Sequence, residues 1–235
     1  MKLSKSLAAI VLICVGAGVA LFMWSRRTQE HCEWKILRGL CDIRVGVQGR
    51  REALGFSGKW LPLAAAREGD SDSWRYAILW CIEHVPEGFS EKRWRESEYA
   101  ECPHPTYCFT NHKNRAGDYT TNCLAVVGNG TLAESDSRVF EKDAILVLAV
   151  GDTEIGWGEP GDLQVDEQGN LISRWPGPIY GRIGVVFGDG GVWLLDASVP
   201  LDKLALFFTV DSARAHDADE VLGPYKVYGE PFGED

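Results

Sequence analysis

The sequence predicts an α+β domain joined to a transmembrane helix that continues into an amphipathic helix, with the amphipathic part packed on a mainly antiparallel sheet. Three observations predict this class: a long uncharged stretch near the start, apolar residues at helical spacing directly after it, and four short β-branched segments in the second half. The chain has 235 residues, 45% of them hydrophobic, which excludes wholesale disorder. We expect four regions: a basic start (1–6), an anchor (7–24), a folded domain (25–210) and an acidic tail (211–235).

Residues 7–24 carry no charge and no proline. A helix of this length would span roughly 27 Å, close to the thickness of a bilayer core, and Trp24 stands where an interfacial aromatic residue belongs. A cleaved signal peptide and a buried core helix are the alternatives. Cleavage after Ala20 would leave four apolar residues at the new end, and a core helix between basic pairs is unusual. We therefore expect residues 7–24 to stay in the bilayer as a single span, with the following domain on the extracytoplasmic side.

Three helices are expected after the anchor. The first covers 30–47, and a run of glycines from 46 onward predicts its end. Its apolar positions follow a 3.6-residue period: Trp34, Leu37, Cys41 and Val45. The second helix covers 73–84 and the third 201–208, and the intervening segment 85–121 is rich in turn residues and charges.

Short segments rich in β-branched residues predict four strands, at 122–128, 143–150, 182–187 and 192–196. The glycine-rich residues 188–191 are expected to join the last two strands as a tight hairpin, and 166–170 to form another turn. The final segment, 211–235, is acidic and contains Gly223-Pro224 and Pro231, so we expect an exposed and poorly ordered tail.

The cysteines after the anchor form an even set, which an oxidising compartment allows. The disulfide candidates are Cys81, Cys102, Cys108 and Cys123. Cys102 and Cys108 could close a small loop across two prolines, and Cys123 is an alternative partner for either of them. Buried free thiols are the alternative interpretation, because cysteine is among the most buried residue types.

Two segments could bind a metal. The first places two thiols and two imidazoles within eleven residues, a set that zinc could use: Cys102, His104, Cys108 and His112. The spacing matches none of the usual zinc patterns. The second is a glycine-rich loop whose carboxylates could hold Ca²⁺: Asp152, Glu154, Glu159 and Asp162. The spacing of an EF-hand is absent, so a solvated acidic loop is the simpler interpretation.

No complete catalytic motif is present in the sequence. The segment 55–58 is not a nucleophile elbow, which requires Gly-x-Ser-x-Gly, and no phosphate-binding loop of the Gly-x-x-x-x-Gly-Lys type occurs. The net charge of −10 disfavours nucleic-acid binding, which needs a basic face to displace counterions. We therefore expect no enzyme activity, no cofactor and no nucleic-acid partner.

Five blocks, in order, resemble a known family: Ser73-Trp74-Arg75, Cys108, 124–131, 157–163 and 185–190. Together they resemble the bacterial pseudopilin-like proteins that carry the domain of unknown function 1559, over roughly 32–209. The resemblance implies a membrane-anchored, extracytoplasmic α+β domain with a pilin-like layout and no assigned activity. The sequence departs from the family at three places, one of which is 141–143, where Glu-Lys-Asp stands in place of the family's Asp-Gly-Thr-Ser-Asn-Thr. It lacks the Gly-Phe cleavage signature and the assembly glutamate near its start, and it has Ile179 where the family's His-x9-Asp-Gly motif has histidine.

Together these observations predict a non-enzymatic interaction or structural protein, with the bilayer as one partner through residues 7–24 and an envelope or secretion-system protein as another. The alternative is a metal- or ligand-binding envelope sensor that uses the Cys102–His112 cluster or the Asp152–Asp162 loop.

Overall fold

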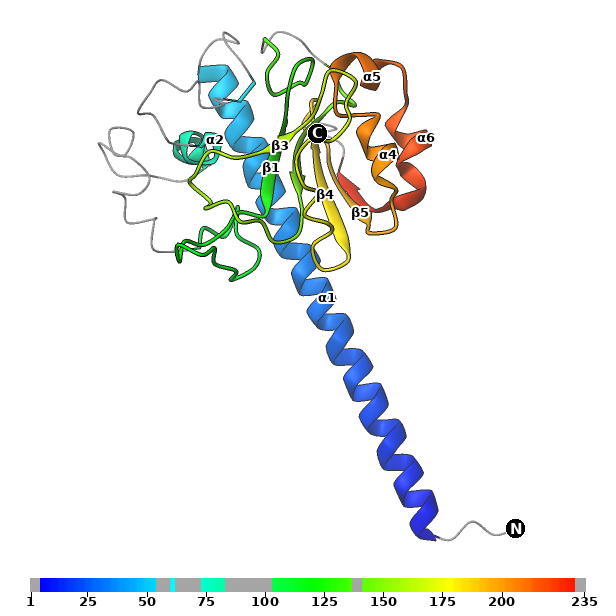
Figure 1. Cartoon of the computed structure of the whole chain (residues 1–235). Coiled ribbons are helices and arrows are strands. Elements are labelled where there is room, and N and C mark those ends of the chain that lie inside the picture. Colours follow the sequence, from blue (N-terminus) through cyan, green and yellow to red (C-terminus); the bar gives the residue numbers. More distant parts are fainter. Residues whose placement is uncertain (1–4, 54–59, 62–72, 83–102, 137–140, 231–235) are drawn as a thin grey trace.

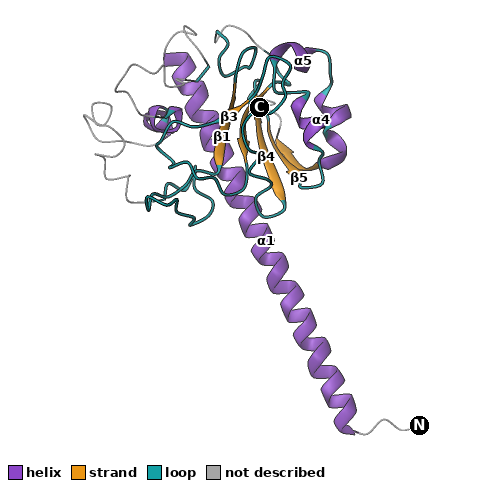
Figure 2. Ribbon diagram, in the orientation of Figure 1, coloured by secondary structure: helices purple, strands orange, loops and turns teal. Residues whose placement is uncertain are grey.

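One long helix and one sheet organise the molecule (Figures 1 and 2). The computed structural model describes residues 5–53, 60–61, 73–82, 103–136 and 141–230. The helix α1 (Lys5–Ala53) passes along the sheet with its second half and extends far beyond the domain with its first half. The described strands form a six-stranded sheet in the order β3-β1-β2-β4-β5-β6. The α+β class and the mainly antiparallel sheet are therefore confirmed.

The sheet is antiparallel throughout its centre. The strands are β1 (Cys123–Val127), β2 (Ile145–Ala149), β3 (Leu163–Gln164), β4 (Arg182–Phe187), β5 (Val192–Asp196) and β6 (Lys226–Glu230). Only the short pair β1–β3 is parallel. The four predicted strands are confirmed as β1, β2, β4 and β5, and the predicted hairpin joins β4 to β5. The turn at 166–170 is also confirmed, because Asp166 accepts hydrogen bonds from Gln168 and Asn170.

The second half of α1 packs on the sheet through one apolar stripe. Ile36, Leu40, Ile43 and Val47 recur at helical spacing and are buried. Gly184 of β4 allows the close approach, because a Cβ at that position would stand 2.5 Å from Leu40 Cδ1. Arg182, at the start of β4, pairs with Glu33 of α1 at 2.7 Å and so fixes the point where the helix leaves the domain.

The predicted end of this helix is wrong. The helix α1 continues through Gly46 and Gly49 to Ala53. A Cβ on Gly46 would lie 2.8 Å from Cγ1 of Ile82, the last residue of the helix α3 (Leu79–Ile82). The glycines therefore let α3 pack closely against α1, and the packing outweighs the modest cost of glycine inside a helix.

The predicted helix over 73–84 is confirmed in part. It is divided into α2 (Trp74–Ala77) and α3 by a turn at Ile78. The predicted helix over 201–208 is shorter than expected, because α4 (Leu201–Ala205) gives way to turns.

The expectation of a poorly ordered tail over 211–235 is wrong for its described part, 211–230. It forms α5 (Val210–Arg214), α6 (Ala218–Val221), the 3₁₀ turn η3 (Gly223–Tyr225) and the edge strand β6, which pairs with β5. Part of the acidic and polar character serves to cap helices: Asp217 accepts from the backbone N–H of Glu220, and Thr209 accepts from that of Ser212. The helices α4, α5 and α6 lie together on the side of the sheet where β5 lies (Figure 1).

Among the residues whose side chains are described, no helix is long and apolar enough to cross a membrane, and residues 1–19 lie outside that set. The membrane span over 7–24 stays a prediction.

Candidate functional site

A buried arginine organises the region that contains most of the predicted site residues. Arg75 of α2 has no exposed surface and donates five hydrogen bonds. Four of them reach backbone carbonyl oxygens: Trp157, Cys123, Glu159 and Gly161. The fifth reaches Asp162 Oδ1 at 2.9 Å and forms an ion pair. One guanidinium group therefore joins α2, β1 and the glycine-rich loop.

The Asp162 carboxylate is an acceptor in this hydrogen-bond network. The same oxygen, Oδ1, also accepts from Trp74 Nε1 and from the backbone N–H of Ala125, each at 2.9 Å. Burial raises the pKa of Asp162, against the opposing effect of the Arg75 charge. The carboxylate that ends the predicted calcium loop is thus held by Arg75, as a structural group.

The other carboxylates of the loop have different surroundings. Glu159 accepts from the backbone N–H of Gly156 at 3.1 Å, and Asp152 accepts from Thr110 Oγ1 at 2.7 Å. The Glu154 side chain is exposed and makes no hydrogen bond or ion pair with the described residues. The loop therefore does not gather its four carboxylates around one point.

The described members of the predicted cysteine–histidine cluster do not lie together. His104 is buried and packs against the rings of Tyr107 and Trp157, with centroids at 5.2 and 5.4 Å. His112 faces Asp152 instead, with Nδ1 4.0 Å from Oδ2. Cys102 lies outside the described residues, and within them no group of three or more metal-ligating side chains occurs.

The described cysteines Cys81, Cys108 and Cys123 are free thiols. Burial raises the pKa of Cys108 to about 12 and also raises that of Cys123, whose sulfur lies 3.6 Å from the Thr106 carbonyl oxygen. Such thiols are poor nucleophiles because the thiolate is scarce at neutral pH. A disulfide that involves Cys102 falls outside the described residues and stays a prediction.

One pocket unites parts of the two predicted sites. It has a volume of about 390 Å³, and we call it the His112 pocket. Its ionisable lining comes from His112, Asp152, Glu154, Asp162 and Arg174, and its apolar lining includes Leu124, Ile155 and Pro176. Sequence reasoning missed Arg174, which follows β3 in the long connection to β4. The available signal was that it is the one charged residue between 170 and 181.

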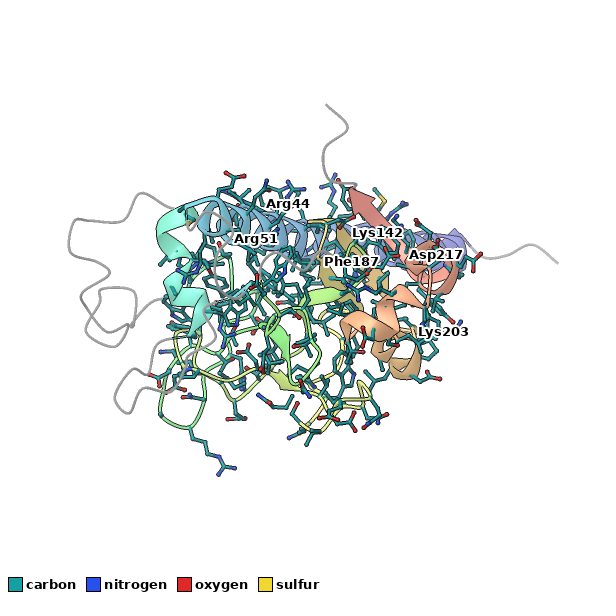
Figure 3. The ribbon with its side chains drawn as sticks, turned by 90° about the horizontal axis from the view of Figure 1, so that it is seen from above. Arg44, Arg51, Lys142, Phe187, Lys203 and Asp217 are labelled. Carbon is teal, nitrogen blue, oxygen red and sulfur yellow. The ribbon has the colours of Figure 1, made fainter. Side chains whose placement is uncertain are left out.

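A second pocket, of about 310 Å³, lies between the C-terminal end of α1 and the β4–β5 hairpin. Arg44 and Arg51 line it from the helix and Phe187 from the end of β4 (Figure 3). The Arg51 guanidinium stacks 3.5 Å from the ring centroid of Trp60. Asp189 also lines this pocket, and its Oδ1 accepts from the backbone N–H of Gly191, so this carboxylate closes the hairpin.

Comparison with known proteins gave no relatives. No family model, no curated protein and no solved structure matches the chain.

Proposed function

We propose that this chain is a membrane-anchored, extracytoplasmic protein of pseudopilin-like layout that acts by non-enzymatic interaction with other envelope or secretion components. The observation that carries the proposal is the division of α1 into two halves. Leu21, Phe22 and Trp24 are 65–70% exposed on the projecting half, whereas Ile36 and Leu40 have no exposed surface. An apolar helical surface without protein cover needs another apolar environment, and a bilayer supplies one.

Two of the blocks that carry the resemblance to the domain of unknown function 1559 contact each other in the structure. The Ser73-Trp74-Arg75 block contacts the 157–163 block through several hydrogen bonds, including Ser73 N–H to the Gly158 carbonyl oxygen at 3.1 Å. Segments that are distant in sequence thus form one structural unit. The proposal keeps the anchor and the layout that the resemblance implies.

The non-enzymatic part of the proposal is supported by the roles of the reactive groups. Arg75 and Asp162 are engaged in holding the loop, and the thiols of Cys108 and Cys123 are buried with raised pKa values. These groups stabilise the fold and are not placed to attack a substrate.

Membrane fractionation in a bacterial host tests the anchor. The full chain with a C-terminal tag should sediment with membranes and resist alkaline extraction, and protease added outside spheroplasts should remove the tag. The double substitution Val15→Arg and Ala17→Arg should release the protein, because each arginine at the centre of the span costs about 2.5–3.5 kcal/mol. Ile172→Arg, which adds an arginine at an exposed position of the folded domain, is the control. Recovery of the wild-type chain as a freely soluble protein would end the proposal.

A further inference from the structure

The His112 pocket lies at the end of the domain from which α1 projects. A path of hydrogen bonds connects the two: Asp152 accepts from Thr110, the Tyr180 hydroxyl donates to the Phe109 carbonyl oxygen, and Gln29 of α1 donates to the Tyr180 carbonyl oxygen. Each of these bonds is 3.1 Å or shorter. The loops that carry these residues lie around the emerging helix (Figure 1).

This position has a consequence if the anchor is in the bilayer. Gln29 follows Trp24 by five residues, which is about 7.5 Å of helix. The headgroup layer extends roughly 5–8 Å beyond the hydrocarbon core on each side. Gln29 and the Tyr180 carbonyl oxygen that it contacts would therefore lie beside the lipid headgroups, and the hydrogen bonds given above join this level to the pocket.

The pocket offers charges of both signs that do not neutralise each other. Arg174 and Glu154 both line it, yet neither side chain makes a hydrogen bond or an ion pair with any described residue. Asp152 is 48% exposed, and its interaction with His112 is long, at 4.0 Å. A ligand with one cationic and one anionic group could pair with both sides of the pocket at once.

We propose that the His112 pocket binds the headgroup of an ethanolamine phospholipid, with the phosphate at Arg174 and the ammonium group at Asp152 and Glu154. A primary ammonium group can donate three hydrogen bonds to carboxylates. The quaternary ammonium of choline cannot donate any and is recognised by aromatic cages, which the described lining of this pocket lacks. The volume of about 390 Å³ falls within the range of small-ligand sites. The inference rests on the proposed membrane anchor.

Lipid retention by the full chain tests this proposal. The protein in a neutral detergent is mixed with ethanolamine or choline phospholipids that have the same acyl chains, and retained lipid is counted by native mass spectrometry. The wild type should retain the ethanolamine lipid about two- to fivefold better, as expected for partly exposed ion pairs. Glu154→Gln should abolish the preference, because this carboxylate faces the ammonium group. Arg174→Gln should lower the retention of both lipids, because both carry the phosphate. Arg214→Gln and Glu220→Gln, which remove exposed charges from α5 and α6, are the matched controls and should keep both the preference and the retention.

Equal retention of the two lipids by the wild type would overturn the inference, as would a preference that survives in Glu154→Gln or lipid retention that is unchanged in Arg174→Gln. A further measurement adds soluble phosphoethanolamine to the protein in detergent and determines whether it binds. If it binds as well in detergent without lipid, the ligand is a soluble molecule and the lipid source is wrong. Fractionation reports separately on the anchor, so a membrane-bound chain without headgroup preference would refute this inference alone.

Discussion

Replacing Arg75 by methionine removes the charge and all five hydrogen bonds while keeping much of the side-chain volume. The substitution leaves Asp162 as a buried carboxylate without its cation. Removing one partner of a buried ion pair costs about 3–5 kcal/mol. The carbonyl oxygens that lose their donor add to this cost. We therefore expect Arg75→Met to lower the free energy of unfolding by about 4 kcal/mol.

Lysine at position 75 separates charge from geometry. It restores a positive charge, but its donors radiate from a single nitrogen and cannot reach acceptors on three segments. Arg75→Lys should therefore cost about half as much as Arg75→Met. The double variant Arg75→Met with Asp162→Asn should be less destabilised than the sum of the single variants by about 2 kcal/mol, because the uncompensated charge is absent.

Urea unfolding in mild detergent, followed by tryptophan fluorescence, measures these differences. The matched control is Arg214→Met. Arg214 is 54% exposed and pairs with Glu141 at 3.1 Å, so its loss should cost less than about 1 kcal/mol. If Arg75→Met costs no more than Arg214→Met, the buried guanidinium does not hold the loop, and the account of Asp162 as a structural group fails.

Three further outcomes are expected from the same protein. Gly184→Ala should cost about 1–3 kcal/mol in urea unfolding because its Cβ would collide with α1, whereas Gly223→Ala, with nothing within 4 Å, should be near neutral; equal effects would contradict the packing of α1 on β4. With a pKa of about 12, Cys108 has about one thiolate in ten thousand at pH 8, so iodoacetamide should label it only after unfolding, as read by peptide mapping; rapid labelling of the folded chain would refute its burial. A chain that ends at Tyr225 loses β6 and should unfold at lower urea than a chain that ends at Glu230; coincident transitions would show that β6 adds nothing to the sheet.

The central strands could be predicted because they depend on local signals. β4 and β5 have the predicted bounds, since a β-branched run and a glycine-rich hairpin specify each other over a short span. β6 was missed because its pairing with β5 depends on residues more than thirty positions away. The acidic composition of 211–235 indicated disorder, whereas Asp217 is used as a helix N-cap.

The candidate site could be predicted only in its parts. The loop carboxylates and His112 were identified from residue type, but nothing in the spacing shows that Asp162 pairs with Arg75, which lies 87 positions earlier. A signal was present, because Arg75 is the one charged residue in the apolar segment 74–82. A charge at such a position has to find partners in the interior or break the helix pattern. That argument predicts a buried ion pair without naming its partner.

The packing of α1 determines which end of the domain faces a bilayer. The helix is held on several sides: the sheet approaches at Gly184, the Thr106–Phe109 segment approaches at Gly39, and α3 approaches at Gly46. Contacts this close fix the rotation of a helix about its own axis, because any turn would drive side chains into backbone. The projecting half continues the same helix without a break. If residues 7–24 span the membrane as proposed, the His112 pocket faces the headgroups, and the second pocket, which Arg44 and Arg51 line, faces away from the membrane toward an envelope partner.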